Sequence, residues 1–277
     1  MRHTDGMFKS VRDLKIYYQS WLPEGEIKAI VLIVHGLGEH SSRYTNVTNY
    51  FVPRGFAVYG FDNVGHGKSD NGREEIDRFE DLTAPVTTIT RMIREWHPDL
   101  PIFIYGHSMG ALITSFHLLD HQADFNGAII SAPLVTIPSH VTPMTVILGK
   151  VMSVIAPKMG VVELDPSSIS HDKSVVEAYI NDPLVFQKKA PARISAEMLR
   201  AMIRVTAEVQ KISLPLFILQ GSDDFLVDPN GAQLLYKKAS SVDKTLKVYD
   251  GLYHEVHNEP EREVMFKDLE TWLENRV

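Results

Sequence analysis

Residues 106–110 read Gly-His-Ser-Met-Gly and directly follow the apolar run at residues 102–105. A serine on a sharp turn from strand to helix takes a strained backbone conformation, and glycine two positions to either side lets the neighbouring elements approach closely. The pattern therefore predicts a buried strand, a nucleophile elbow at Ser108 and a helix over residues 109–119. The first N–H groups of that helix would point at negative charge forming beside Ser108.

Two later apolar runs lead into residues that would complete a triad with Ser108. Residues 216–220 read as a strand and continue into Gly-Ser-Asp-Asp, and residues 245–249 read as a strand before Gly-Leu-Tyr-His at 251–254. The order serine, acid, histidine, each just beyond a strand, is typical of triads on alternating strand–helix folds. Three such groups in order predict a Ser-His-Asp hydrolase.

Three aspartates compete for the role of the acid. Asp228 precedes Pro229 and a helical stretch, which suits an N-cap with proline at the first helical position. Asp223 lies nearest the strand end, where its side chain can bond the backbone of the turn. Asp224 is therefore the predicted triad acid.

The loop after the last strand holds two histidines. His254 lies nearer the strand, whereas His257 stands where the last helix begins, so His254 is the predicted base. The two are three residues apart in a loop rather than four apart on a helix, so we predict no metal site and no cofactor.

An acyl-transfer site also needs N–H donors for the oxyanion. One normally follows the nucleophile, and another comes from the loop after an early strand. Residues 30–34 read as such a strand, and His-Gly-Leu-Gly at 35–38 is its loop. We assign the two donors to the backbone N–H groups of Leu37 and Met109.

The chain resembles the monoacylglycerol lipase family, lysophospholipase-like serine hydrolases of the α/β-hydrolase fold. The resemblance covers nearly the whole chain. It is carried by residues 35–44 (HGLGEHSSRY), 62–69 (DNVGHGKS), 106–110 (GHSMG), 181–184 (NDPL), 221–224 (GSDD) and 253–254 (YH).

The resemblance selects Asp224 and His254 independently and places Leu37 at the oxyanion loop. It also implies a small polar pocket for a glycerol head group, bordered by Glu39, Arg43, His107 and Tyr179. Mammalian members carry cysteines near the site and this chain has none, so thiol-based inhibition is not expected here.

The wider pattern predicts an α/β class. After paired strands over 7–10 and 15–21, strands near 29–34, 57–61, 102–105 and 128–131 alternate with helices near 44–51, 82–96 and 109–119. Short β-branched runs without polar alternation indicate a mostly parallel central sheet with helices on both faces. The alternation stops after residue 133, so we expect a core over 1–133 and 202–277 and an inserted helical cap, or lid, over 134–201.

The stretch 144–155 within this cap is apolar almost all round, with Lys150 as its one charge. Such a helix is either buried on several sides or exposes apolar surface for a purpose. Both hypotheses stay open. In the second, the resemblance implies that these residues line an acyl tunnel or face a membrane: Met144, Ile147, Leu148, Val151 and Ile155.

Composition limits the partners. A chain of 277 residues with 44% hydrophobic content can bury one large core, and a formal net charge of −7 argues against nucleic acid. Cysteine is absent, the first residues lack a signal-peptide pattern, and no apolar run reaches the roughly 18 residues of a membrane span. We expect a cytoplasmic location with peripheral membrane contact through the cap as an option, and the oligomeric state stays open.

These observations predict a carboxylic ester hydrolase that acts through an acyl-enzyme, with the lipid ester monoacylglycerol as substrate. The nearest alternative is a lysophospholipase or a broad short-chain carboxylesterase; a peptidase of the same fold and a non-catalytic binding module are further alternatives. We expect structural roles for His35, Asp62 and His66, and a solvated loop for the acidic cluster at 74–77.

Overall fold

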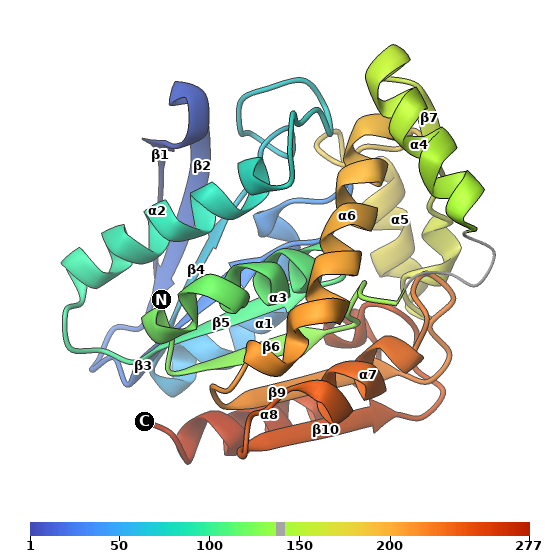
Figure 1. The fold of residues 1–277 in the computed structure, drawn as a ribbon. Coiled ribbons are helices and arrows are strands. Elements are labelled where there is room, and N and C mark those ends of the chain that lie inside the picture. Colours follow the sequence, from blue (N-terminus) through green and yellow to red (C-terminus); the bar gives the residue numbers. More distant parts are fainter. Residues whose placement is uncertain (137–141) are drawn as a thin grey trace.

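The computed structural model describes residues 1–136 and 142–277 and is built on an eight-stranded sheet in the order β1-β2-β4-β3-β5-β6-β9-β10 (Figure 1). β1 (Arg2–Lys9) and β4 (Phe56–Phe61) both pair antiparallel with β2 (Lys15–Leu22). The remaining neighbours run parallel: β3 (Ala29–Val34), β5 (Ile102–His107), β6 (Gly127–Ser131), β9 (Leu216–Gly221) and β10 (Lys244–Tyr249). The predicted mostly parallel sheet is confirmed.

Every residue of the five strands β3, β4, β5, β6 and β9 is buried, which is why their sequences lack polar alternation. The edge strand β1 differs. It starts at Arg2 rather than near residue 7, and most of its residues are exposed. Polar residues on an exposed edge carry little apolar signal, so the sequence revealed only its last part.

Helices cover both faces of the sheet in separate apolar layers (Figure 1). One layer packs α2 (Glu80–Trp96), α3 (Met109–His121), α6 (Ala192–Glu208) and α7 (Asn230–Lys238). The other packs α1 (Thr45–Phe51) and α8 (Arg262–Glu274). The sheet is therefore covered by an apolar layer on each face.

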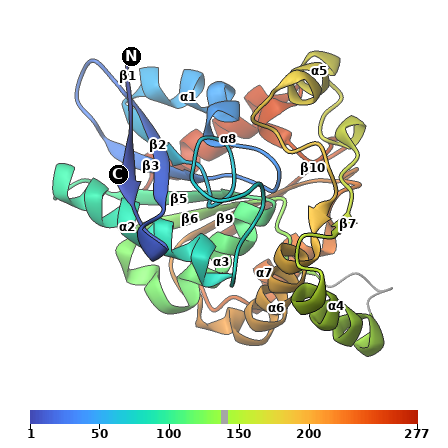
Figure 2. The same ribbon diagram turned by 90° about the horizontal axis from the view of Figure 1, so that it is seen from above.

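The segment between β6 and β9 lies at the end of the sheet toward which β10 points (Figures 1 and 2). It contains α4 (Pro143–Ile155), α5 (Lys173–Asn181) and the small sheet of β7 (Gly160–Val162) with β8 (Ala190–Pro191). α6 is continuous, so the expected cap boundary after Ala201 falls inside one helix. Residues 137–141 of the expected cap lie outside the described residues.

α4 packs against α6 and projects from a corner of the molecule (Figures 1 and 2). Six of its apolar side chains are exposed by 44% to 75%: Met144, Ile147, Leu148, Val151, Val154 and Ile155. Burial of this helix on several sides is therefore wrong, because most of its apolar side chains are exposed in the described part of the chain. Within the described residues no helix is both long and apolar enough to cross a membrane.

The expectation of a solvated loop at 74–77 is wrong for two of its residues. Glu74 is 2% exposed and Ile76 is also buried. The loop folds back on itself, since the Glu74 N–H donates to the carbonyl of Gly65, which has a positive φ of 74°. The acidic sequence at 74–77 does not predict such a closed loop, because the burial of Glu74 and Ile76 depends on residues elsewhere in the chain.

Candidate active site

Ser108 lies between β5 and α3 with φ 55° and ψ −118°, a strained conformation for a residue other than glycine. A Cβ at Gly110 would collide with the carbonyl oxygen of Val34, and one at Gly106 with the hydroxyl of Thr114. Both glycines are therefore needed where strand and helix cross. The predicted elbow is confirmed as a structural feature.

His254 and Asp224 meet although they follow different strands. His254 Nδ1–H donates to Asp224 Oδ2 at 2.7 Å. Asp224 Oδ1 accepts from the N–H groups of Leu226 and Val227 at 2.9 and 3.0 Å, and Oδ2 also accepts from Gln220 Nε2 at 2.8 Å. The buried carboxylate is thus held by four donors. Gln220 was not predicted from the sequence, where its signal is a polar residue in an otherwise apolar strand.

The charges of this pair support each other. Burial alone would raise the pKa of Asp224, but the neighbouring His254 lowers it below its usual value. Burial would likewise lower the pKa of His254, and the Asp224 charge outweighs this and raises it. The arrangement favours an ionised carboxylate beside an imidazole that readily accepts a proton.

The competing residues lie elsewhere. Asp228 Oδ1 accepts from the N–H of Asn230 at 2.9 Å, at the start of α7 as expected for a helix-start residue. Asp223 belongs to the turn after β9, where its Oδ1 accepts from the Ser222 hydroxyl at 2.8 Å, and among the described residues it hydrogen-bonds to neither histidine. His257 is buried and stacks on Tyr44 with ring centroids 4.9 Å apart; burial lowers its pKa to about 4.

Ser108 and His254 line one cavity of about 630 Å³. No hydrogen bond joins the Ser108 hydroxyl to His254 in the part of the chain that the structure describes. The side chains that form what we call the polar wall are Glu39, Arg43, Tyr179 and Glu255. The side chains of α4 and α6 that form what we call the apolar wall are Leu148, Met152, Met198, Leu199 and Met202.

The predicted oxyanion donors lie at two loops beside Ser108. Leu37 lines the cavity, and its N–H makes no hydrogen bond within residues 1–136 and 142–277. Met109 is the first residue of α3, and an N–H at a helix start has no partner inside the helix. Both groups are therefore available to an acceptor.

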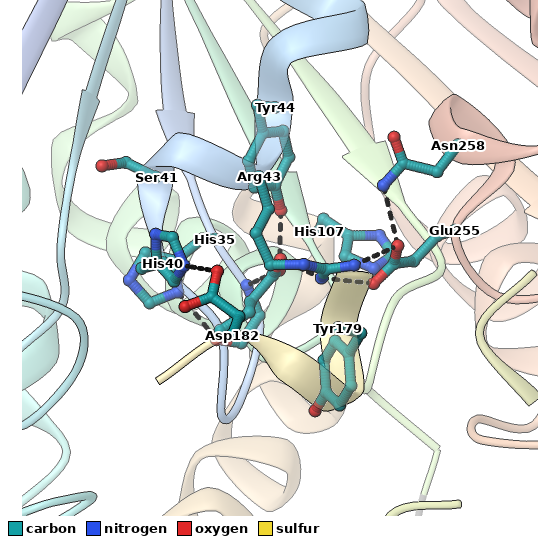
Figure 3. A network of polar contacts seen from close by, with 12 residues as sticks. His35, His40, Ser41, Arg43, Tyr44, His107, Tyr179, Asp182, Glu255 and Asn258 are labelled. Carbon is teal, nitrogen blue, oxygen red and sulfur yellow. Dashed lines mark hydrogen bonds and ion pairs between the residues drawn. The ribbon is translucent and has the colours of Figure 1, made fainter. Parts of the chain in front are cut away.

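Arg43 is the centre of a buried polar network (Figure 3). Its Nη1 donates to Glu255 Oε1 at 2.6 Å and to Glu39 Oε2 at 2.8 Å, and its Nη2 donates to Glu255 Oε2 at 2.9 Å. Its guanidinium carbon lies 4.6 Å from the centre of the Tyr179 ring. Glu255 was not predicted from the sequence, where its signal is a carboxylate directly after the predicted base.

Burial and charge act in opposite directions in this network. Burial would raise the pKa of Glu255, but the Arg43 charge and its hydrogen bonds lower that pKa to about 2. Burial raises the pKa of Glu39, and Arg43 offsets this only in part. Burial disfavours the Arg43 charge, yet the two carboxylates raise its pKa.

Other residues singled out from the sequence hold loops together. His35 Nδ1–H donates to the Gly36 carbonyl and Nε2 accepts the Asn63 N–H, both at 2.8 Å. Asp62 accepts from the N–H of Ser41 at 2.8 Å. The structural roles expected of His35 and Asp62 are confirmed. Among the described residues, no group of three or more His, Cys, Asp or Glu could hold a metal ion.

His107 borders the cavity beside the catalytic histidine candidate. Its ring centroid lies 4.6 Å from that of His254, and its Nδ1 lies 3.1 Å from Ser131 Oγ. Burial, and then the charge of His254, lower the pKa of His107. His107 is therefore a neutral ring that packs against His254.

Known proteins are similar to this chain in sequence. A family model described as serine aminopeptidase, S33, matches residues 25–261. Monoacylglycerol lipase of Mycolicibacterium smegmatis is 33% identical over 96% of this chain and 95% of that protein. Human monoglyceride lipase is 33% identical over 95% of this chain and 88% of that protein.

A solved structure gives the same result in three dimensions. The crystal structure of Paleococcus ferrophilus monoacylglycerol lipase matches with a TM-score of 0.82 and 28% identity, and the match covers 100% of both chains. The predicted α/β-hydrolase fold is confirmed. The chain therefore belongs to the monoacylglycerol lipase family of α/β-hydrolases and is a carboxylic ester hydrolase.

Proposed function

We propose that this enzyme hydrolyses monoacylglycerols to a fatty acid and glycerol. The observation that carries the proposal is that Ser108 lies in a cavity with both a polar and an apolar wall. An ester with a hydrocarbon chain and a small hydroxyl-rich head group suits such a cavity, because each half meets surface of its own polarity. The names of the similar proteins support the same substrate class.

The reaction would proceed through an acyl-enzyme. Ser108 attacks the ester carbonyl while His254 takes its proton, and His254 later activates the water that releases the fatty acid. Asp224 orients His254 and stabilises the imidazolium. The N–H groups of Leu37 and Met109 hold the oxyanion of each tetrahedral intermediate.

Tyr179 would be the main head-group donor. Its hydroxyl makes no hydrogen bond within the described residues, and burial raises its pKa, so it keeps its proton. Several polar atoms of Arg43 and Glu39 already form hydrogen bonds with each other and with neighbouring residues. We therefore assign them, with His107, to the border of the head-group pocket and give Tyr179 the direct contact.

The segment around α4 would act as a cap with two functional faces. Leu148 lines the cavity and would contact the acyl chain. The exposed side chains of the helix would rest on the lipid surface that holds the substrate, which gives peripheral membrane contact. They are Met144, Ile147, Val151 and Ile155. As a domain division we propose that the cap extends to the end of α6.

The test combines a substrate panel with labelling. Ser108→Ala should lose roughly 10⁴- to 10⁶-fold in kcat and all labelling by a fluorophosphonate probe. The wild type should prefer monoacylglycerol over lysophospholipid, short p-nitrophenyl esters and aminoacyl amides. Preference for lysophospholipid, for the short ester or for the amide would replace our proposal by the corresponding alternative. Full activity of Ser108→Ala would reject the mechanism.

A further inference from the structure

A chain of hydrogen bonds connects the loop that carries His254 with the loop that carries the Leu37 N–H (Figure 3). We propose that Glu255 is a positioning residue for ester hydrolysis, which acts through Arg43 and Glu39 to hold the oxyanion loop in register with His254. The inference rests on the proposed function of the site. It gives this network a task in the reaction that does not depend on the head group of the substrate.

The first link fixes the oxyanion loop. Glu39 Oε1 accepts the Gly36 N–H at 2.6 Å and the Tyr44 hydroxyl at 2.9 Å. Gly36 precedes Leu37, so this bond orients the peptide next to the proposed oxyanion donor. There is little free space, since a Cβ at Gly36 would lie 2.9 Å from Glu39 Oε1 and 3.3 Å from Ser108 Cβ. A shift of Glu39 would therefore move the loop relative to Ser108.

The second link joins Glu39 to the loop of His254. Arg43 Nη1 contacts both carboxylates, and Nη2 makes the second bond of a bidentate pair with Glu255. Bidentate pairs fix orientation as well as distance. Asn258 Nδ2 donates to Glu255 Oε2 at 2.7 Å and holds the carboxylate from the other side. Because Glu255 follows His254 directly, its anchoring restrains that loop.

Stability alone accounts poorly for this arrangement. Buried ion pairs recover little beyond the cost of taking their charges out of water. Three charged side chains are each almost fully buried here, and the Tyr179 ring covers the Arg43 guanidinium. The arrangement instead fixes the relative position of the two loops that carry His254 and Leu37. The carbonyl carbon and carbonyl oxygen of the substrate must lie between these loops.

The network also contributes charge. The carboxyl groups of Glu255 and Glu39 both favour a positive charge on His254. Burial opposes protonation of His254, and Asp224 first, then Glu255 and Glu39, favour it. The imidazolium that forms during attack is stabilised in the same way. The charged and titratable groups around this ring are Asp224, Glu255, Glu39, Arg43, His107 and His257.

Two substitutions of Glu255 separate position from charge. Glu255→Gln removes the charge, so kcat should fall about 10- to 100-fold, and the acid limb of the kcat/KM profile should move to lower pH. Glu255→Asp keeps the charge but shortens the reach to Arg43, so kcat should fall while the acid limb stays in place. Both losses should be similar for monoacylglycerol and p-nitrophenyl acetate, with KM little changed.

Asp243→Asn is the matched control, because Asp243 also forms a bidentate pair, with Arg276, away from the cavity. Its kcat and pH profile should equal those of the wild type. Rates are normalised to active sites titrated with fluorophosphonate, so that misfolded protein does not count.

Several results would overturn the inference. They are wild-type kcat in Glu255→Gln, a loss confined to monoacylglycerol, and an unmoved acid limb in Glu255→Gln. If Ser108→Ala is inactive while Glu255→Gln retains full kcat, only this inference fails. If Ser108→Ala is active, the proposed function fails first.

Discussion

The polar wall of the cavity is tied to the hydrolase core by hydrogen bonds, whereas the apolar wall rests on the packing of α4 against α6. On the polar side, the Phe186 N–H donates to the Gly38 carbonyl at 2.8 Å and His40 Nε2 contacts Asp182 Oδ2 at 2.9 Å. These bonds join the segment around α5 to the loop after β3. Figure 2 shows α4 on the opposite side of this end of the molecule.

The difference follows from what each wall would bind. Hydroxyl groups are recognised through distance and angle, so the groups that bind them must be held in place. A hydrocarbon chain needs volume and apolar surface but no particular angle, because the hydrophobic effect is non-directional. A helix with one packed face and one exposed apolar face is sufficient for that task.

The largest expected effect concerns the machinery that both walls share. Asp224→Asn should lower kcat by about 10⁴-fold for every ester, since the amide no longer holds His254 in the correct tautomer. Steady-state kinetics on monoacylglycerol and on p-nitrophenyl acetate measure this. If Asp224→Asn kept near-normal activity while Asp223→Asn or Asp228→Asn was inactive, the assignment of Asp224 as the triad acid would be wrong.

The polar wall is tested by Tyr179→Phe. One lost buried hydrogen bond costs about 1–3 kcal/mol, so kcat/KM for monoacylglycerol should fall by roughly five- to 150-fold. The matching ethyl ester lacks the glycerol hydroxyls and should be affected much less. Equal losses on the two substrates would remove the glycerol pocket from the proposal.

The apolar wall is tested by separate replacement of Ile147, Leu148 and Val151 with serine. At least one variant should lose several-fold in liposome association and long-chain turnover, while p-nitrophenyl acetate hydrolysis and Tm stay close to wild type. Leu148→Ser should also slow turnover of detergent-dispersed long-chain substrate, because this side chain lines the cavity.

The same three variants can also reject membrane docking. A buried aliphatic position would instead lose about 2–5 kcal/mol of stability. If all three variants are strongly destabilised, or none changes liposome association, α4 does not dock on lipid. The assignment as an ester hydrolase would stand in either case.

The smallest effect on activity is expected at Glu74, close to the polar wall. Burial raises the pKa of this carboxyl to about 8, and its Oε2 has no partner within the described residues. The native state therefore keeps a proton that the unfolded chain releases near its ordinary pKa, and the contribution of this carboxyl to wild-type stability declines as the pH rises from about 5 to 8. Glu74→Gln lacks this titration.

The Tm of Glu74→Gln relative to wild type should therefore increase over that pH range, with kcat at pH 7 unchanged. Thermal unfolding at pH 5, 6, 7 and 8 measures the trend. A constant Tm difference would show that the carboxyl is ionised when folded.

Local patterns were sufficient for most of the fold. Apolar runs such as the one before Ser108 predicted the buried strands, because a strand covered on both faces must be apolar throughout. The exposed strand β1 and the end of the cap were predicted less well. β1 is an edge strand with mostly polar, exposed residues. α6 runs without interruption across the boundary expected after Ala201.

The sequence by itself determined the chain order of Ser108, Asp224 and His254 and the strand ends that carry them, since turn glycines and apolar runs are local signals. The tertiary structure alone decided which polar side chains meet inside the molecule. Arg43 and Glu255 are 212 positions apart yet form a bidentate pair, and Glu74 is buried within an acidic run. The physical reason is that burial and pairing of charges depend on distant segments brought together by the sheet, which no local pattern records.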